Sequence, residues 1–236
     1  MAVTFYDNLP INEDIVLDWP MTEGGSSLIH DQSKSGSIGT FLGAWGPIWP
    51  AAIPQPFYGI YMFRIWTQYI NCPAADTTNL NFTSGDYSLS FWIKWAVDEY
   101  TQMVMGKYVL DNSGWEAYLD NAGGLDYMSV RHNHGGTPAR TSSYSTGWAQ
   151  NILHLFGYSR TGATAQHYRN GIAIPTTISA GGLIDPASSA ADDLRVGCRF
   201  TEGSNWYNGY LGRPRAWARA LNADEHRQLY AQGNAQ

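Results

Sequence analysis

The side chains best suited to bind a ligand or a partner are tryptophans that stand outside the regular segments of the chain. Ten of the 236 residues are Trp, more than a core of this size requires. Four of them lie in or beside stretches with Gly, Pro and Asn, namely Trp45, Trp49, Trp66 and Trp206. At such positions an indole face can stack on a sugar ring or bury itself against another protein. The alternative, in which these side chains cover the core beneath a long loop, stays open.

The histidines are the next candidates for chemistry, as metal ligands or as a base. His132-Asn133-His134 presents two imidazoles, but the following Gly135-Gly136 and the lack of a nearby third ligand favour a polar loop over a zinc site. His154 alternates with Phe156 and Tyr158, which favours a buried, hydrogen-bonded histidine over a catalytic base. The sequence also has no Gly-rich phosphate loop after a strand and no Ser in a nucleophile elbow. It therefore predicts neither a zinc site nor nucleophilic catalysis.

Alternating apolar residues predict the strands that must hold these side chains. From Tyr87 to Trp95 every odd residue is apolar, so one face of this strand points into a core. The segment from Leu194 to Phe200 alternates in the same way and places Cys198 on its buried face. Further strands joined by turn-forming residues are predicted at 103–109, 115–119, 125–132, 152–159 and 164–169. Strands at this regular spacing indicate a sandwich or a barrel.

Helical signals are confined to the C-terminal region. Asn222 can cap a helix, and Glu225 follows three residues later, which is the spacing of a capping box. The pattern predicts one short helix at about residues 223–231.

Composition narrows the class of protein and of partner. Aromatic residues make up 14% of the chain, charged residues 14%, and there are 25 Gly, a mix that favours short strands and tight turns. The net charge is −6 and no dense cluster of Lys or Arg could follow a phosphate backbone, so nucleic acid is not expected as a partner. No apolar stretch reaches the roughly 18 to 20 residues that cross a bilayer, so membrane insertion is not expected either. We expect a single domain over residues 1–236, with a Pro- and Trp-rich loop at about 43–56.

The N-terminal region lacks the marks of a cleavable secretory signal. Lys34 is the first basic residue, and Asp7 and Glu13 stand where a signal would carry basic and then apolar residues. The chain has two cysteines, Cys72 and Cys198, and without a signal both are expected to be free thiols.

A set of weak motifs runs in order along nearly the whole chain, from about residue 15 to 231. Its members are Leu17 to Gly25, Asp31-Gln32-Ser33, Gly59, Phe63, Tyr69-Ile70, Tyr87 to Trp95, Trp148, His154, Tyr168 to Gly171, Tyr207 to Gly212, Ala220-Leu221, Glu225 and Leu229-Tyr230. In this order they resemble the laminin G-like and concanavalin A-like family. The resemblance implies an all-β fold, a two-sheet antiparallel jelly-roll sandwich with one short C-terminal helix. Two features depart from it: Gly212-Arg213-Pro214 stands where relatives often carry acidic residues, and the loop at 43–56 is longer than expected.

The resemblance also implies where a catalytic or a metal site would lie. Hydrolytic relatives carry Glu-x-Asp-x-x-Glu on one strand, which aims the carboxylates into a single groove. That arrangement is missing, because Glu13-Asp14 with Asp18 has the wrong spacing and Asp98-Glu99 stands at a strand end, so no enzyme is expected. Many relatives bind a structural calcium near the rim of the sandwich, and Asp31 is the candidate ligand here. The alternative is that Asp31 closes an Asx turn with Ser33. No other cofactor is expected.

Three functions follow as hypotheses. The first is a non-catalytic structural or surface-display module, most simply a virion component of the bacteriophage head-decoration or tail-fibre type, which contacts protein subunits of a larger assembly and also glycans. It would be made in the cytoplasm and displayed on the particle. The second is a free-standing, extracellular lectin-like protein that binds carbohydrate. The third, a glycan hydrolase or lyase, lacks its carboxylates.

Overall fold

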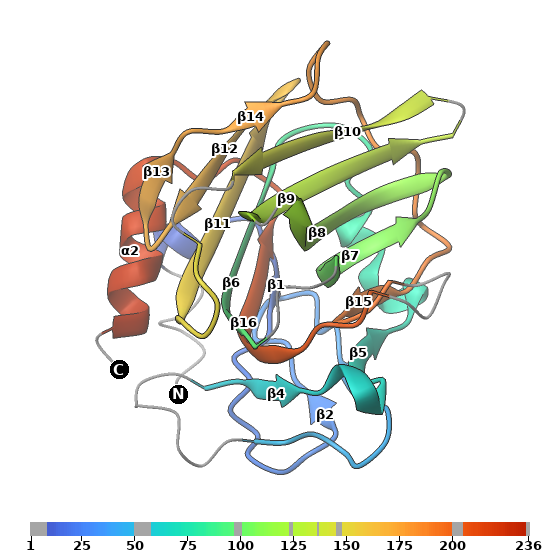
Figure 1. Cartoon of the computed structure of the whole chain (residues 1–236), viewed down its shortest axis with the longest axis vertical. Helices are drawn as coiled ribbons and strands as arrows, with labels where there is room; N and C mark the ends of the chain where they lie inside the picture. The colour runs from blue at the N-terminus through green and yellow to red at the C-terminus, as the bar shows by residue number, and fades with distance from the viewer. Residues whose placement is uncertain are drawn as a thin grey trace.

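Two antiparallel β-sheets face each other in the computed structural model, and one α-helix covers the outer face of one of them (Figure 1). The structure describes residues 9–49, 58–96, 101–122, 125–135, 137–144, 148–199 and 205–234. The prediction of a jelly-roll sandwich with a C-terminal helix is confirmed.

The first sheet has seven strands in the described residues, in the order β1-β16-β6-β11-β12-β13, with β4 also paired to β16. The strands are β1 (Ile15–Asp18), β4 (Ile60–Met62), β6 (Tyr87–Trp95), β11 (His154–Thr161), β12 (Thr164–Arg169), β13 (Ile172–Ile174) and β16 (Gly209–Trp217). Strand β16 comes late in the chain but lies between β1 and β6, so the first sheet closes only when the C-terminal part of the chain returns to it.

Over the same described ranges, the second sheet has nine strands in the order β14-β10-β9-β8-β7-β15-β5-β3-β2. They are β2 (Leu28–Ile29), β3 (Gly39–Leu42), β5 (Tyr69–Cys72), β7 (Gln102–Val109), β8 (Ser113–Ala122), β9 (Leu125–His134), β10 (Thr137–Tyr144), β14 (Thr177–Ile178) and β15 (Leu194–Val196). Here β15 joins β5 to β7. Long crossings of this kind, rather than hairpins alone, distinguish a jelly roll from a meander.

The main core lies between the two sheets. All the odd residues of β6 belong to it, among them Tyr87, Phe91 and Trp95, as the alternation predicts. The opposite sheet contributes Trp115 and Val130 from β8 and β9. Full burial of one such aromatic or aliphatic side chain stabilises the fold by about 1.5–3 kcal/mol. Because apolar residues alternate along each strand, this gain determines which face of each sheet turns inward.

Helix α2 (Ala223–Asn234) begins with the predicted capping box. The Asn222 Oδ1 atom accepts hydrogen bonds from the backbone N–H groups of Asp224 (2.9 Å) and Glu225 (3.0 Å), and the Glu225 carboxylate accepts from the Asn222 N–H (2.8 Å). Leu229 of this helix packs with Trp92 and other side chains in a second apolar cluster on the outer face of the first sheet.

Three short 3-10 helices complete the described elements, namely η1 (Pro10–Asn12), η2 (Arg64–Trp66) and η3 (Ala74–Leu80). No helix in the described ranges is long and apolar enough to cross a membrane.

Two details of the sequence-based prediction are wrong. The segment His132-Asn133-His134 is the end of strand β9 and not a polar loop, and the His132 ring is fully buried between Tyr87 Oη (2.6 Å) and the Ile184 carbonyl oxygen (2.8 Å). These two distant partners let a polar side chain occupy a core-facing position. The strand expected to reach Phe200 ends at Val196, because Gly197 adopts a φ of +94° and turns the chain away. Cys72 and Cys198 are buried and unpaired.

Candidate functional site

Two of the four predicted contact tryptophans come together at one end of the sandwich. Trp45 lies in the loop after β3, Trp66 ends η2, and their ring centroids are 6.5 Å apart. The Trp66 ring also contacts Phe63 (4.4 Å), which in turn contacts Tyr61 of β4 (4.6 Å). We call Trp45, Trp66, Phe63, Tyr61 and the adjoining Ile65 the aromatic surface.

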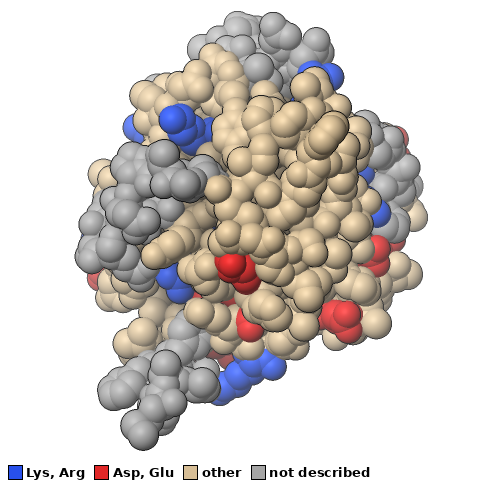
Figure 2. Space-filling view, turned by 90° about the horizontal axis from the view of Figure 1, so that it is seen from below, with Lys and Arg blue, Asp and Glu red and all other residues tan. Residues whose placement is uncertain are grey.

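Two members of the aromatic surface are largely open to solvent, while Tyr61, Phe63 and Trp66 are half-buried. Trp45 is 81% exposed and Ile65 is 82% exposed, the two largest values among the exposed large apolar side chains of the described residues. Figure 2 views the end of the sandwich at which β4 lies, and it shows a broad area without charged side chains there. Exposed apolar side chains that gather in one area mark a contact site for another molecule more often than scattered ones do.

A buried amide holds the aromatic surface in shape. Gln68 is fully buried, and its Oε1 atom accepts a hydrogen bond from the Phe63 N–H at 2.7 Å. Its Nε2 atom donates to the backbone carbonyls of Ala44 (3.1 Å) and Gly46 (2.9 Å), on either side of Trp45. The Ala44 N–H donates in turn to the Trp66 carbonyl at 3.0 Å. One side chain thus ties the loop of Trp45 to the segment of Phe63 and Trp66.

The close approach of these two segments requires a glycine. Gly43 has a φ of +119°, and a Cβ atom on it would lie 2.7 Å from the Thr67 carbonyl oxygen and 2.8 Å from the Gln68 Cα atom. Any side chain at this position would push the two segments apart.

Trp206 belongs to a second aromatic group. Its ring lies 5.6 Å from that of Tyr69 in β5, and the Arg195 guanidinium lies over the Tyr69 ring at 4.5 Å. The Arg64 N–H of η2 donates to Asn208 Oδ1 at 3.4 Å, which connects the segment after Trp206 to the aromatic surface.

Trp49 has a different environment from Trp45. It is half-buried and packs against the main core between the sheets, as the alternative interpretation of these tryptophans predicts. Residues 50–57, which include the rest of the Pro-rich loop predicted at 43–56, lie outside the described residues.

Asp31 forms the turn that the second interpretation of this residue predicts. Its Oδ1 atom accepts from the N–H groups of Asp18 and Ser33, both at 2.8 Å, and its Oδ2 atom accepts from Ser33 Oγ (2.7 Å) and the Ser37 N–H (3.0 Å). A calcium ligand must direct its oxygens at the cation, whereas here hydrogen-bond donors surround both oxygens. Asp31 in this arrangement does not fit a calcium site. Within the described part of the chain, no group of three or more His, Cys, Asp or Glu residues could hold a metal ion.

Comparison with known proteins agrees with this architecture. The family described as the concanavalin A-like lectin/glucanases superfamily matches residues 67–225. The chain belongs to this superfamily. No curated protein matches the sequence.

Solved structures with the same fold include binding domains of two other proteins. The botulinum neurotoxin DC binding domain is 14% identical with a TM-score of 0.68, both in its complex with rat synaptotagmin II and in its complex with SialylT. The binding domain of Paraclostridial Mosquitocidal Protein 1 is 14% identical with a TM-score of 0.67. The chain is covered to 94% by each of them but spans only about half of their length, 52% to 53%. At this identity the likeness concerns the fold.

The superfamily name covers both lectins and glucanases, and glycoside hydrolysis depends on carboxyl groups. Glu116 of β8 is a fully buried carboxylate, and it accepts from Arg199 Nε (3.0 Å) and Nη2 (2.9 Å). Arg131 lies 3.5 Å from the same carboxylate. A glycosidase acid must donate a proton to the leaving oxygen, and a carboxylate held between two guanidinium groups is poorly suited to carry that proton. Asp98 and Glu99 lie outside the described residues.

Sequence reasoning missed the parts of the site that are not tryptophans. The segment from Tyr61 to Tyr69 has four aromatic residues in nine, and this density was the available signal for Phe63 and Tyr69. Nothing in the sequence marks Gln68, because its role depends on three backbone groups that only the fold brings to it.

Proposed function

We propose that this chain is a non-catalytic binding module, displayed as a virion component of the head-decoration or tail-fibre type, which attaches to a protein subunit through the aromatic surface. The observation that carries the proposal is the indole of Trp45, four-fifths exposed and yet fixed in place by its neighbours. Its site of action is the particle surface.

Conformational entropy and buried area together decide how tightly the aromatic surface can bind a partner. An exposed Trp side chain loses conformational entropy when it binds, and the loss is larger when the loop that carries it is flexible. Here Gln68 and Gly43 already restrict the loop, so less conformational entropy is lost on binding. A larger part of the favourable contact free energy then remains as affinity. A Trp that becomes buried at the centre of an interface contributes about 2 kcal/mol or more.

A second candidate is a lectin-like protein that uses the same surface. An exposed indole beside a second ring is suited to stacking on the apolar face of a sugar. The solved binding domains that share this fold over about half of their length include one in complex with rat synaptotagmin II and one in complex with SialylT.

The test compares Trp45→Ala with Ile172→Ala, a control that removes another exposed apolar side chain (66% exposed) from the edge strand β13. Occupancy of each variant is measured on particles purified from the producing cells, and binding is measured in parallel on a glycan array. We expect at least a tenfold loss of particle occupancy for Trp45→Ala and no loss for Ile172→Ala. If the chain binds glycans through Trp45 and is not found on particles, the lectin function replaces the display function. If Trp45→Ala changes neither readout, the aromatic surface is not the contact site.

A further inference from the structure

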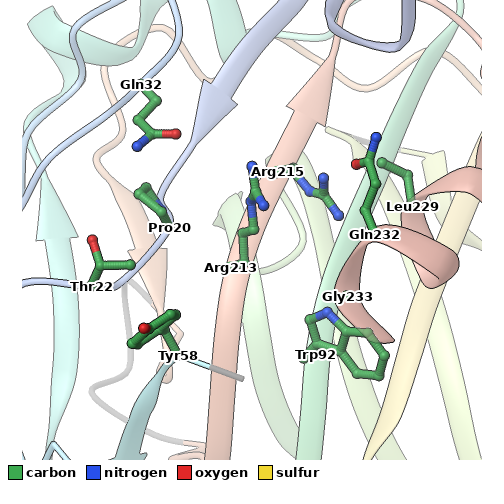
Figure 3. Close-up of a pocket in the computed structure, with 10 residues that line it drawn as sticks. All are labelled: Pro20, Thr22, Gln32, Tyr58, Trp92, Arg213, Arg215, Leu229, Gln232 and Gly233. Carbon is green, nitrogen blue, oxygen red and sulfur yellow. The ribbon is translucent and has the colours of Figure 1, made fainter. Parts of the chain in front are cut away.

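A separate pocket of about 200 Å³ lies on the outer face of the first sheet, between β16, the loop after β1 and helix α2 (Figure 3). It contains Arg213, which belongs to the Gly212-Arg213-Pro214 segment that departs from the family pattern. The aromatic surface shares none of its residues with this pocket.

An irregularity in β16 builds one wall of the pocket. The pairing of β16 with β6 shifts register between Gly212 and Arg215, and Arg213 has a φ of +41°, a left-handed conformation that a non-glycine residue rarely adopts. Bulges of this kind redirect side chains, and strained backbone that persists often accompanies a functional site. Arg213 and Arg215 both line the pocket, and Figure 3 shows them side by side in its middle.

The two guanidinium groups are fixed before any ligand arrives. Arg213 donates from Nε and Nη2 to the two carboxylate oxygens of the fully buried Asp18, each at 3.0 Å. That pair uses two of the five N–H donors of the fork and sets its plane. Arg215 is only 2% exposed, and its guanidinium lies over the Trp217 ring at 5.6 Å. Burial, together with the charge of Arg215, lowers the pKa of His226 to about 3.

The other walls offer neutral polar groups and aromatic faces. Gln32 and Thr22 lie on one side, Gln232 of α2 on the other, and Trp92 and Tyr58 contribute rings (Figure 3). Gly233, which also lines the pocket, lies directly against the Trp92 ring, because a Cβ atom on it would be 2.4 Å from that ring. Amides and a hydroxyl both donate and accept hydrogen bonds, which suits a ligand with several hydroxyl groups.

We infer that this pocket binds a single carboxylated sugar, with its carboxylate on Arg213 and Arg215 and its ring between Trp92, Tyr58 and the glutamines. A planar guanidinium fork matches the two oxygens of a carboxylate. The volume is below the roughly 300–1,000 Å³ of sites for drug-sized ligands, which restricts the ligand to one ring.

The test uses glucuronate and glucose, which share a ring and differ in the carboxylate, with acetate and sulfate as anions that lack the ring. Binding is followed by titration calorimetry with the full chain. We expect saturable glucuronate binding, with glucose, acetate and sulfate each at least tenfold weaker. Glucuronate binding should weaken at least tenfold in Arg215→Gln and at least threefold in Gln232→Ala. The exposed Gln228→Ala on the same helix is the matched control and should bind normally.

Because Arg215 is buried, Arg215→Gln can fail to fold, and Thr22→Trp then serves instead, since Thr22 is exposed and a larger side chain there closes the pocket without disturbing the core. Sulfate binding as tightly as glucuronate, with no effect of Gln232→Ala, would show a simple anion site and overturn the inference. Absence of saturable binding at millimolar glucuronate would overturn it as well. Trp45→Ala should leave glucuronate binding unchanged. The test of the pocket can therefore fail or succeed independently of the test of the aromatic surface.

Discussion

Trp45 and Trp49 stand close together in the sequence, yet one indole is turned to solvent and the other is packed against the core. At the level of single residues, Trp45 is therefore available for recognition, whereas Trp49 contributes to stability. The same residue type in the same Pro-rich segment can serve either purpose, and the difference lies in what each ring contacts.

The contrast predicts opposite effects on folding. Trp45→Ala should change the free energy of unfolding by less than about 0.5 kcal/mol, as surface substitutions usually do, whereas Trp49→Ala should lower it by about 1–3 kcal/mol because it removes half-buried apolar contacts. Denaturant titration of both variants measures this. A large loss of stability in Trp45→Ala would assign that ring to the core and remove it from the aromatic surface.

At the scale of elements, helix α2 connects the C-terminal region to the outer face of the first sheet and forms one wall of the arginine-lined pocket. Its position depends on the cap at Asn222 and on the packing of Leu229. Loosening the first turn would therefore affect the pocket as well as the helix.

The cap makes a measurable contribution of its own. Asn222→Ala removes the acceptor of the Asp224 and Glu225 N–H groups and should lower the free energy of unfolding by about 1 kcal/mol. The exposed Gln228→Ala in the same helix should stay within about 0.3 kcal/mol of the parent chain, because Ala and Gln have similar helix propensities. Equal stabilities of the two variants in denaturant titration would show that the capping box contributes nothing.

At the scale of the whole molecule, the sandwich buries four histidines as neutral side chains. Burial lowers the pKa of His132 and of His154 to about 4 and that of His167 to about 3, and burial with the charge of Arg215 lowers that of His226 to about 3. In the unfolded chain these groups take up protons below a pH of about 6.5. The unfolded state therefore binds more protons than the folded one between about pH 6.5 and 4, and the stability present above pH 6.5 is lost as the pH falls through this range.

The expected loss is large for a protein of this size. Between pH 7.5 and 5.5 each histidine lowers the free energy of unfolding by about 1 kcal/mol, so the four together lower it by several. Denaturant titrations at pH 7.5, 6.5 and 5.5 measure the slope, and His167→Asn should reduce it by about a quarter. A stability that does not change over this range would contradict the neutral burial of these side chains.

The alternation of β6 and the capping box of α2 could be predicted from the sequence because each depends on residues that are neighbours along the chain. The sequence could not distinguish the exposed Trp45 from the half-buried Trp49. Only the tertiary structure decided which segments meet: Gln68 between the two halves of the aromatic surface, His132 between Tyr87 and Ile184, and Arg213 against Asp18 at the other end of the chain. Local pattern determines which face of a strand turns inward, but a polar contact between distant residues forms only when the long crossings of the two sheets bring its partners together.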